Sequence, residues 1–179
     1  MQPPVLVTAP TARVVELSAM KAHLRVDYDD EDTLITALEA AAVAHFDGWR
    51  GIMGRAIMPQ TWSQEFSGWG RHKLLLPDAS SVSAVGILDG VESPITETDI
   101  YVSTTMGGQF VTVSGGDADA VRITYEAALP AEQLPAVQMA VKLLVGHWYE
   151  NREAATETAL SAAPMAVQAL IAPLRLVTV

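Results

Sequence analysis

The spacing of apolar residues changes twice along the chain, and this change constrains the fold more than any other feature. Up to about residue 55, and again from about residue 134, apolar residues recur every three or four positions, as on one face of a helix. Between residues 55 and 127 they instead alternate with polar residues in short runs punctuated by Gly, Pro, Asp and Ser. The sequence therefore predicts an α+β protein with a β-rich segment inserted between helical segments.

The helical segments are expected to form four helices that pack as a helical bundle. Their expected ranges are 18–26, 30–50, 134–154 and 164–171. Ser18 is the expected N-cap of the first helix, and Asp29 or Asp30 that of the second. The third helix has few polar positions, so we expect it to be buried on nearly all sides.

The central segment predicts a small antiparallel β-subdomain of about four to six strands. Its strand-like runs are MPQTWSQEF (58–66), KLLLP (73–77), SVSAVGIL (81–88), DIYVS (99–103), QFVTV (109–113) and AVRITYEA (120–127). Residues 1–16 are expected to be an N-terminal arm whose prolines exclude a helix, with VLV (5–7) as a candidate edge strand. We assign residues 17–171 to one domain and residues 172–179 to a C-terminal tail.

The charge of the chain argues against a protein that grips nucleic acid. Eleven Lys and Arg stand against 21 Asp and Glu, which gives a formal net charge of −10. No basic patch of the kind that neutralises phosphates is apparent. An acidic wall would, however, let DNA slide past without adhering to it. We also predict no signal peptide and no membrane span, because no apolar run reaches the roughly 18 residues that a span requires.

An acidic run, DYDDED (27–32), is a candidate calcium site because carboxylate oxygens are dense in it. An EF-hand loop that starts at Asp27 needs Gly at its sixth position and Glu at its twelfth, where this chain has Asp32 and Leu38. We therefore interpret the run as a solvated acidic turn that caps the following helix.

A second polar cluster, HWYENRE (147–153), ends the apolar third helix. Three interpretations compete: a metal or catalytic site, the polar end of a buried helix, or a surface that meets another chain. The chain has four His and no Cys, and it lacks both the HExxH pattern of zinc enzymes and the GxSxG pattern of hydrolases. We predict no catalytic residue, no metal and no cofactor, and we do not expect an enzyme.

Three groups of residues keep a characteristic order and spacing along nearly the whole chain. They are Lys21, His23, Leu24, Arg25, Val26, Asp27, Asp32, Gly54, Arg55, Gln60, Thr61 and Trp62; then His147, Trp148, Tyr149, Glu150 and Arg152; and last Pro164, Val167, Leu170, Ile171, Pro173 and Arg175. Together they resemble the head–tail connector family of tailed phages and phage-like gene transfer agents, also called adaptor or head-completion proteins. One departure is Leu174, where an aromatic residue is common in that family.

The resemblance implies a structural virion protein whose connector domain forms a ring of about twelve copies. The ring would lie beneath the capsid portal, join head to tail and extend the DNA channel. Expected partners are the portal protein, a tail-side connector, stopper or terminator protein, and DNA that passes without specific binding. The chain would be made in the host cytoplasm and reside at the head–tail junction of the virion, with no membrane contact. Residues expected at subunit contacts are Arg25, Asp32, Trp148, Tyr149 and Arg152.

The C-terminal segment LIAPLRLVTV is almost wholly apolar, with Arg175 as its only charge. An apolar end with one cation suits insertion between subunits of a partner. We therefore predict docking onto the portal through Pro173, Leu174, Arg175, Leu176 and Val177. The alternative is that the tail folds back over the core of its own subunit. Two other functions also stay open: a tail-terminator or other virion ring protein, and a small metal-dependent hydrolase.

Overall fold

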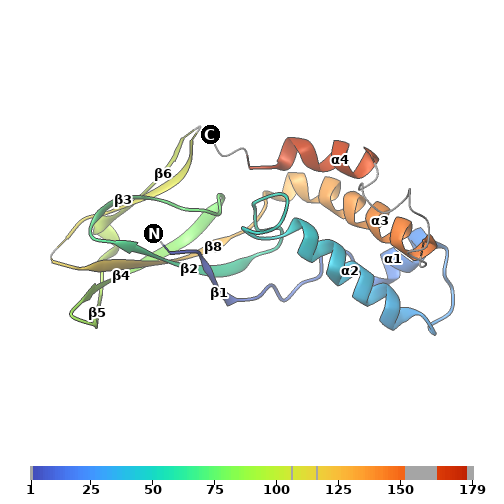
Figure 1. Ribbon diagram of the computed structural model, residues 1–179, viewed down its shortest axis with the longest axis horizontal. Coiled ribbons are helices and arrows are strands. Elements are labelled where there is room, and N and C mark those ends of the chain that lie inside the picture. Colours follow the sequence, from blue (N-terminus) through green and yellow to red (C-terminus); the bar gives the residue numbers. More distant parts are fainter. Residues whose placement is uncertain (1, 106, 116, 152–164, 177–179) are drawn as a thin grey trace. The chain divides into compact units, whose positions relative to one another are not determined.

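A computed structural model describes residues 2–105, 107–115, 117–151 and 165–176 (Figure 1). The chain divides into two compact units, each assembled from segments distant in sequence. One, here called the β unit, includes Met1–Thr11 and Met58–Leu129. The other, the helical unit, comprises Ala12–Ile57 and Pro130–Arg175.

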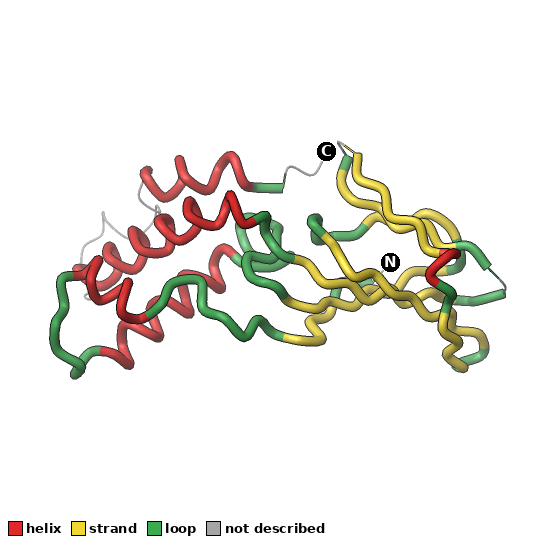
Figure 2. The backbone as a smooth tube through the Cα atoms, turned by 180° about the vertical axis from the view of Figure 1, so that it is seen from behind, coloured by secondary structure: helices red, strands yellow, loops and turns green. Residues whose placement is uncertain are grey.

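The β unit contains a five-stranded and a three-stranded antiparallel sheet (Figure 2). The larger sheet has the order β1-β2-β8-β4-β5 and the smaller one the order β3-β7-β6. The strands are β1 (Val5–Thr8), β2 (Gln60–Ser67), β3 (Gly70–Lys73), β4 (Ala79–Leu88), β5 (Val91–Pro94), β6 (Ile100–Thr105), β7 (Gly108–Val113) and β8 (Ala120–Ala127). A 3₁₀ turn, Glu97–Asp99, precedes β6.

Alternating burial along β2, β7 and β8 places the core of the β unit on one face of each sheet. Val111, Ile123 and Tyr125 are fully buried there. Side chains also join the two sheets. The amide of Gln109 on β7 bonds both backbone groups of Ala79 on β4, at 2.6 and 2.9 Å.

The helical unit contains four α-helices among its described residues. They are α1 (Leu17–Leu24), α2 (Asp32–Phe46), α3 (Leu134–Glu150) and α4 (Met165–Ile171), and 3₁₀ turns precede α3 (Ala131–Gln133) and follow α4 (Ala172–Leu174). Helix α3 packs against α1, α2 and α4 (Figure 1). Ile35 and Phe46 of α2 and Val141 and Val145 of α3 have no solvent exposure, so the core forms where these helices meet. Five residues of α3 are buried, whereas Met139 is 45% exposed, so the helix is buried on one face and not on nearly all sides as expected.

The expectation of a helical bundle carrying a small β-subdomain is wrong. In the described part of the chain, eight strands in two antiparallel sheets stand beside four helices, which makes a sheet-rich mixed structure. Two strands carried little β signal: β3 with the sequence GRHK, and β5 with the sequence VESP. Each forms by pairing with a longer neighbour, β7 and β4 respectively.

Three local predictions also fail. Ser18 lies inside α1, whose N-cap is Glu16, and α2 begins after Glu31 without a side-chain cap. The run KLLLP is a strand only as far as Lys73, because its leucines fill the core from a loop, with Leu74 and Leu76 buried. The candidate edge strand in the arm is confirmed, since β1 lies at the edge of its sheet.

Candidate functional site

Two of the three sequence motifs meet at one end of the helical unit. His23 and Leu24, at the end of α1, lie over Gly146 of α3, where a methyl group added to the glycine would sit 3.6 Å from Nε2 of His23. A pocket of about 370 Å³ opens beside this contact, and its lining residues are His23, Leu24, Arg25, Gly146, Tyr149 and Glu150. A separation of 3.6 Å is an ordinary van der Waals contact, so the end of α1 packs directly against α3 and the two motifs lie side by side.

Arg25 ends α1 in a left-handed conformation with a φ of 58°. The amide of Val26 donates to the carbonyl of Lys21 at 3.0 Å, as in other helix C-caps that reverse the chain. Glycine is the usual residue there, so an arginine carries a conformational cost. The guanidinium of Arg25 is exposed beside the pocket.

The acidic run that follows is held by a lysine from α1. The ammonium of Lys21 lies 2.5 Å from Asp29 and 2.8 Å from Asp32. Its hydrogen bond to Asp29, followed by that to Asp32, raises the pKa of Lys21 above its ordinary value. The same contact lowers the pKa of Asp29. The run DYDDED is therefore an ion-paired turn that ties α1 to the start of α2. It supplies the N-cap of α2, Glu31, but without the expected side-chain capping bond.

A tyrosine from α3 completes this network. The hydroxyl of Tyr149 donates to the carboxylate of Glu31, which also accepts a hydrogen bond from Tyr28 at 3.2 Å. The bond to Glu31, and after it the one to Tyr28, raises the pKa of Tyr149. The Tyr149 phenol therefore stays protonated near neutral pH and donates to a carboxylate that also accepts from Tyr28. The end of α3 is thereby fixed to the acidic turn.

A second cluster surrounds Arg55, which follows Gly54 in the Gly-Arg motif. Gly54 has a φ of 64°, a conformation that side chains disfavour. From this turn the Arg55 guanidinium donates to the side chain of Gln133 at 3.0 Å and to the carbonyl of Leu174 at 3.3 Å. Arg55 thus joins the loop after α2 to both the start of α3 and the C-terminal 3₁₀ turn.

The C-terminal residues up to Arg175 are attached to their own helical unit. Val167 and Ile171 of α4 are buried, and Nε of Arg175 donates to the carbonyl of Ile52 at 3.0 Å. Pro173 and Arg175 are exposed and Leu174 is half-buried. Leu176 is the last described residue, and Val177 lies beyond it.

The residues predicted at subunit contacts fall into two groups. Asp32 and Tyr149 have partners inside the chain, whereas Arg25 is exposed and Trp148 is half-buried. Arg152 lies outside the described residues. The structure brings Arg25, Asp32 and Tyr149 to the same end of the helical unit, and their role between subunits stays a prediction.

His147 belongs to the polar end of α3. The amide and the side chain of Asn151 both donate to the carbonyl of His147, at 3.1 and 2.8 Å. Across the described segments, no group of three or more His, Cys, Asp or Glu is placed to hold a metal ion. In the same residues, no helix has the length and apolar character needed to cross a membrane.

Sequence reasoning did not identify the partners of the two residues on which the site depends most. Lys21, a residue of the first motif, and Glu31, one charge of the acidic run, each bind two partners. The spacing of Lys21 from Asp29 spans a helix end and a turn, so no periodic pattern marks the pair. Gly54 and Arg55 form a local motif in the sequence, but the partners of the Arg55 guanidinium lie 78 and 119 residues away.

The structure is similar to solved chains from gene transfer agent particles. One, from the neck of an empty particle computed with C6 symmetry, is 21% identical, with a TM-score of 0.75. A second, from the virion of a native particle, is 22% identical with the same TM-score. A third, from the neck of a native particle computed with C12 symmetry, is 23% identical, with a TM-score of 0.68. Each match covers 99% of this chain and 97% of the other.

No family model and no curated protein matches the sequence. At these identities the likeness to the solved chains establishes a shared fold over almost the entire length. The resemblance to connector proteins, which was drawn from motifs alone, agrees with this fold.

Proposed function

We propose that this chain is a structural, non-enzymatic connector of the neck of a phage-like particle. The observation that carries the proposal is the shared fold, which extends over 99% of this chain and 97% of a neck chain. The contact between the two motifs supports it independently, because Lys21, His23 and Tyr149 were selected from sequence and lie at the same end of the helical unit. The chain acts by binding other proteins, and no cofactor takes part.

In the assembled particle, about twelve copies form a ring under the capsid portal and extend the DNA channel toward the tail. The C6 and C12 symmetries of the similar neck structures support a ring of this size. The formal charge of −10 per chain suits a channel wall that does not retain DNA. The chain is made in the host cytoplasm and incorporated at the head–tail junction, where it also meets a tail-side protein.

Docking onto the portal uses the C-terminal tail. Because Leu174 and Arg175 bond to Arg55 and Ile52, the chain leaves its own helical unit at a defined point. The exposed Pro173 and Arg175, together with Leu174, Leu176 and Val177, then form an apolar end with a single cation. Such an end fits pockets between subunits of a partner, where Arg175 meets a carboxylate.

Removal of the gene from a particle-producing strain tests this function. We expect DNA-filled heads without tails, and tailed particles again when the gene is restored. Mass spectrometry of purified restored particles should detect the chain. Normal tailed particles in the deletion strain, or particles that lack the chain, would refute the proposal.

Two truncations then test the tail in the same strain. Removal of residues 176–179 preserves the bonds of Leu174 and Arg175, whereas removal of residues 172–179 also deletes them. Both truncated proteins should fold, and neither should join heads that carry portals. Normal incorporation of the protein that lacks only residues 176–179 would show that another surface docks onto the portal.

A further inference from the structure

The outward face of the three-stranded sheet combines two cations with two aromatic rings. Directly paired residues of antiparallel strands project to the same side of a sheet. Arg71 of β3 pairs with Thr112 of β7, which pairs with Tyr101 of β6. In the next row on this side, Lys73 pairs with Phe110 and Phe110 with Ser103. We call these six residues the basic sheet face: Arg71, Lys73, Tyr101, Ser103, Phe110 and Thr112.

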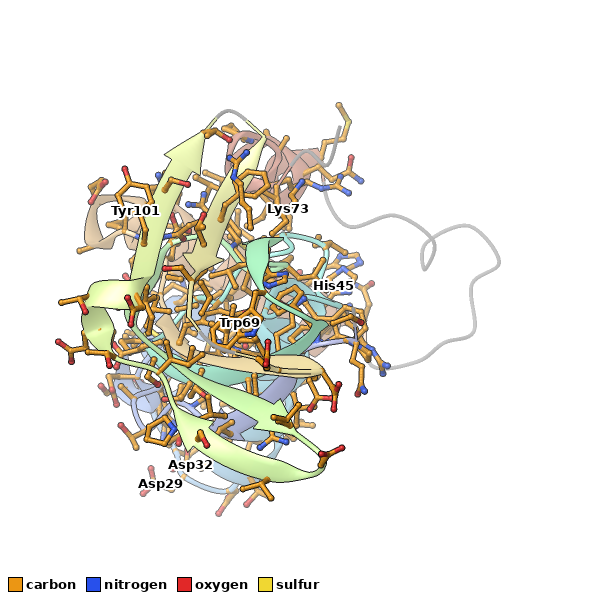
Figure 3. The ribbon with its side chains drawn as sticks, turned by 90° about the vertical axis from the view of Figure 1, so that its left-hand side faces the viewer. Asp29, Asp32, His45, Trp69, Lys73 and Tyr101 are labelled. Atoms are coloured by element: carbon orange, nitrogen blue, oxygen red, sulfur yellow. The ribbon has the colours of Figure 1, made fainter. Side chains whose placement is uncertain are left out.

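Burial along β7 shows which way this face points. Gln109, Val111 and Val113 alternate with Phe110 and Thr112, and only the first three are buried. On the basic sheet face Tyr101 is 68% exposed, and the Arg71 guanidinium lies over the Phe110 ring at 3.8 Å from its centroid. Figure 3 labels Lys73 and Tyr101, which stand on the two outer strands of this sheet. The face is therefore open to solvent.

In the described part of the chain, Lys21 and Arg122 have carboxylate partners, whereas the two cations of this face have none. Lys21 contacts two aspartates, and Arg122 contacts Glu65 at 3.3 Å and Glu92 at 2.5 Å. Within the described residues, neither Arg71 nor Lys73 has a carboxylate in ion-pair contact. The chain has 21 acidic residues against 11 basic ones, so carboxylates that could pair with Arg71 and Lys73 are plentiful. Exposed Tyr, Phe and Arg are also enriched where proteins bind each other.

A complementary surface lies on the helical unit. In the acidic run 27–32, Asp29 and Asp32 are bound by Lys21. Asp27 and Asp30 are exposed, and no cation of the described residues is in ion-pair contact with either. Tyr28 between them is 53% exposed. We call Asp27, Tyr28 and Asp30 the acidic tip.

We propose that the basic sheet face binds the acidic tip of a second copy of this chain. The inference rests on the proposed ring, because two different patches that meet between copies form a head-to-tail contact, the type that closes a ring. Arg71 and Lys73 pair with Asp27 and Asp30 of the neighbour, and Tyr28 packs against Tyr101 and Phe110. Two cations on a chain of net charge −10 are too few to hold a duplex, whose binding requires several phosphate contacts.

Charge reversal with mutual rescue tests the contact. Arg71→Glu and Asp30→Lys should each lower self-association at least about tenfold, because each places like charges together. An equimolar mixture of the two variants should restore it, since each altered patch then meets an altered partner. Arg50→Glu is the matched control, because Arg50 is also exposed and lies over an aromatic ring, that of Trp49, at 4.7 Å. Circular dichroism verifies that every variant is folded.

Zero-length carbodiimide cross-linking supplies the measurement. Labelled and unlabelled protein are mixed, and mass spectrometry identifies bonds between copies. We expect Lys73 joined to Asp27 or Asp30 of another copy, with a yield that falls in each single variant and recovers in the mixture. Cross-links between copies that never join these residues, or a yield unchanged by Arg71→Glu, would overturn the inference.

A DNA-binding measurement separates this partner from nucleic acid. We expect no binding of a short duplex at physiological salt by the wild type. Binding that Arg71→Glu abolishes and Arg50→Glu retains would make the face a nucleic-acid surface and overturn the proposal. Failure of the proposed function has a different signature, since the chain would then be missing from purified particles. A chain present in particles without the Lys73 cross-link refutes only the present inference.

Discussion

The hydroxyl of Tyr149, near the end of α3, donates to the carboxylate of Glu31, which lies 118 positions earlier. Tyr28 donates to the same oxygen, so one carboxylate joins the acidic turn to the last turn of α3. The polar residues after the apolar stretch of α3 therefore serve first to attach the helix inside the chain. Any contact that this region makes with another subunit starts from a pre-arranged surface.

Tyr149→Phe should lower the urea midpoint of unfolding without changing the slope of the unfolding free energy against urea concentration. The substitution preserves the ring and removes one donor to a charged carboxylate, a stronger type of hydrogen bond than a neutral pair. Tyr101→Phe is the matched control, because Tyr101 is 68% exposed. Its urea midpoint should equal that of the wild type. Equal midpoints for all three proteins would show that the bond contributes nothing to stability.

Lys21→Met should destabilise the protein at neutral pH and much less in acid. The bond from Lys21 holds the pKa of Asp29 below its ordinary 3.8, so this contribution is present above about pH 3.8 and is lost as the pH falls through the lowered value. The pKa of Lys21 is raised above its ordinary 10.5, so the same contribution is lost again in strong alkali. Urea unfolding of both proteins at pH 3 and pH 7 measures the difference. A difference in unfolding free energy between the two proteins that is larger at pH 3 than at pH 7 would contradict the prediction.

Glu39→Gln should weaken the dependence of stability on pH. Glu39 is 7% exposed in α2, and burial raises its pKa above the ordinary 4.5. An acid with a raised pKa in the folded state loses its stabilising contribution as the pH rises from about 4.5 through that higher value. Glutamine stays neutral and removes this loss, so the variant should gain stability relative to the wild type between pH 4.5 and pH 7. Glu97→Gln, at an exposed position, should leave the pH profile unchanged.

Ile35→Ala should cost about 2–5 kcal/mol of unfolding free energy, as expected for truncating a fully buried side chain. Its neighbour Leu34 is 36% exposed, and Leu34→Ala should cost distinctly less because solvent replaces part of the lost contact. Chemical denaturation of the two variants provides a matched comparison on the same helix. Similar losses at both positions would mean that the acid-turn end of α2 is buried differently from the structure described.

The resemblance to connector proteins was available from sequence because it depends on local signals. Period and spacing located α1, α2 and α3 to within a few residues, and alternation located β2, β7 and β8. The motif around Lys21 and the motif around Tyr149 could each be seen separately. Local patterns of this kind depend on side chains a few positions apart, and these are fully present in a linear sequence.

The pairing of those motifs was decided only in the tertiary structure. Glu31 meets Tyr149 and Arg55 meets Leu174 across more than a hundred positions, and no period connects residues so far apart. The sheets were underestimated for a related reason, since β3 is a strand only because β7 supplies its hydrogen bonds. The composition showed an acidic chain, but the gathering of Arg71 and Lys73 beside Phe110 needed the register of two strands. Charge and periodicity can be read from the sequence, whereas contacts across a sheet or between two helices form only when the chain folds and brings distant segments together.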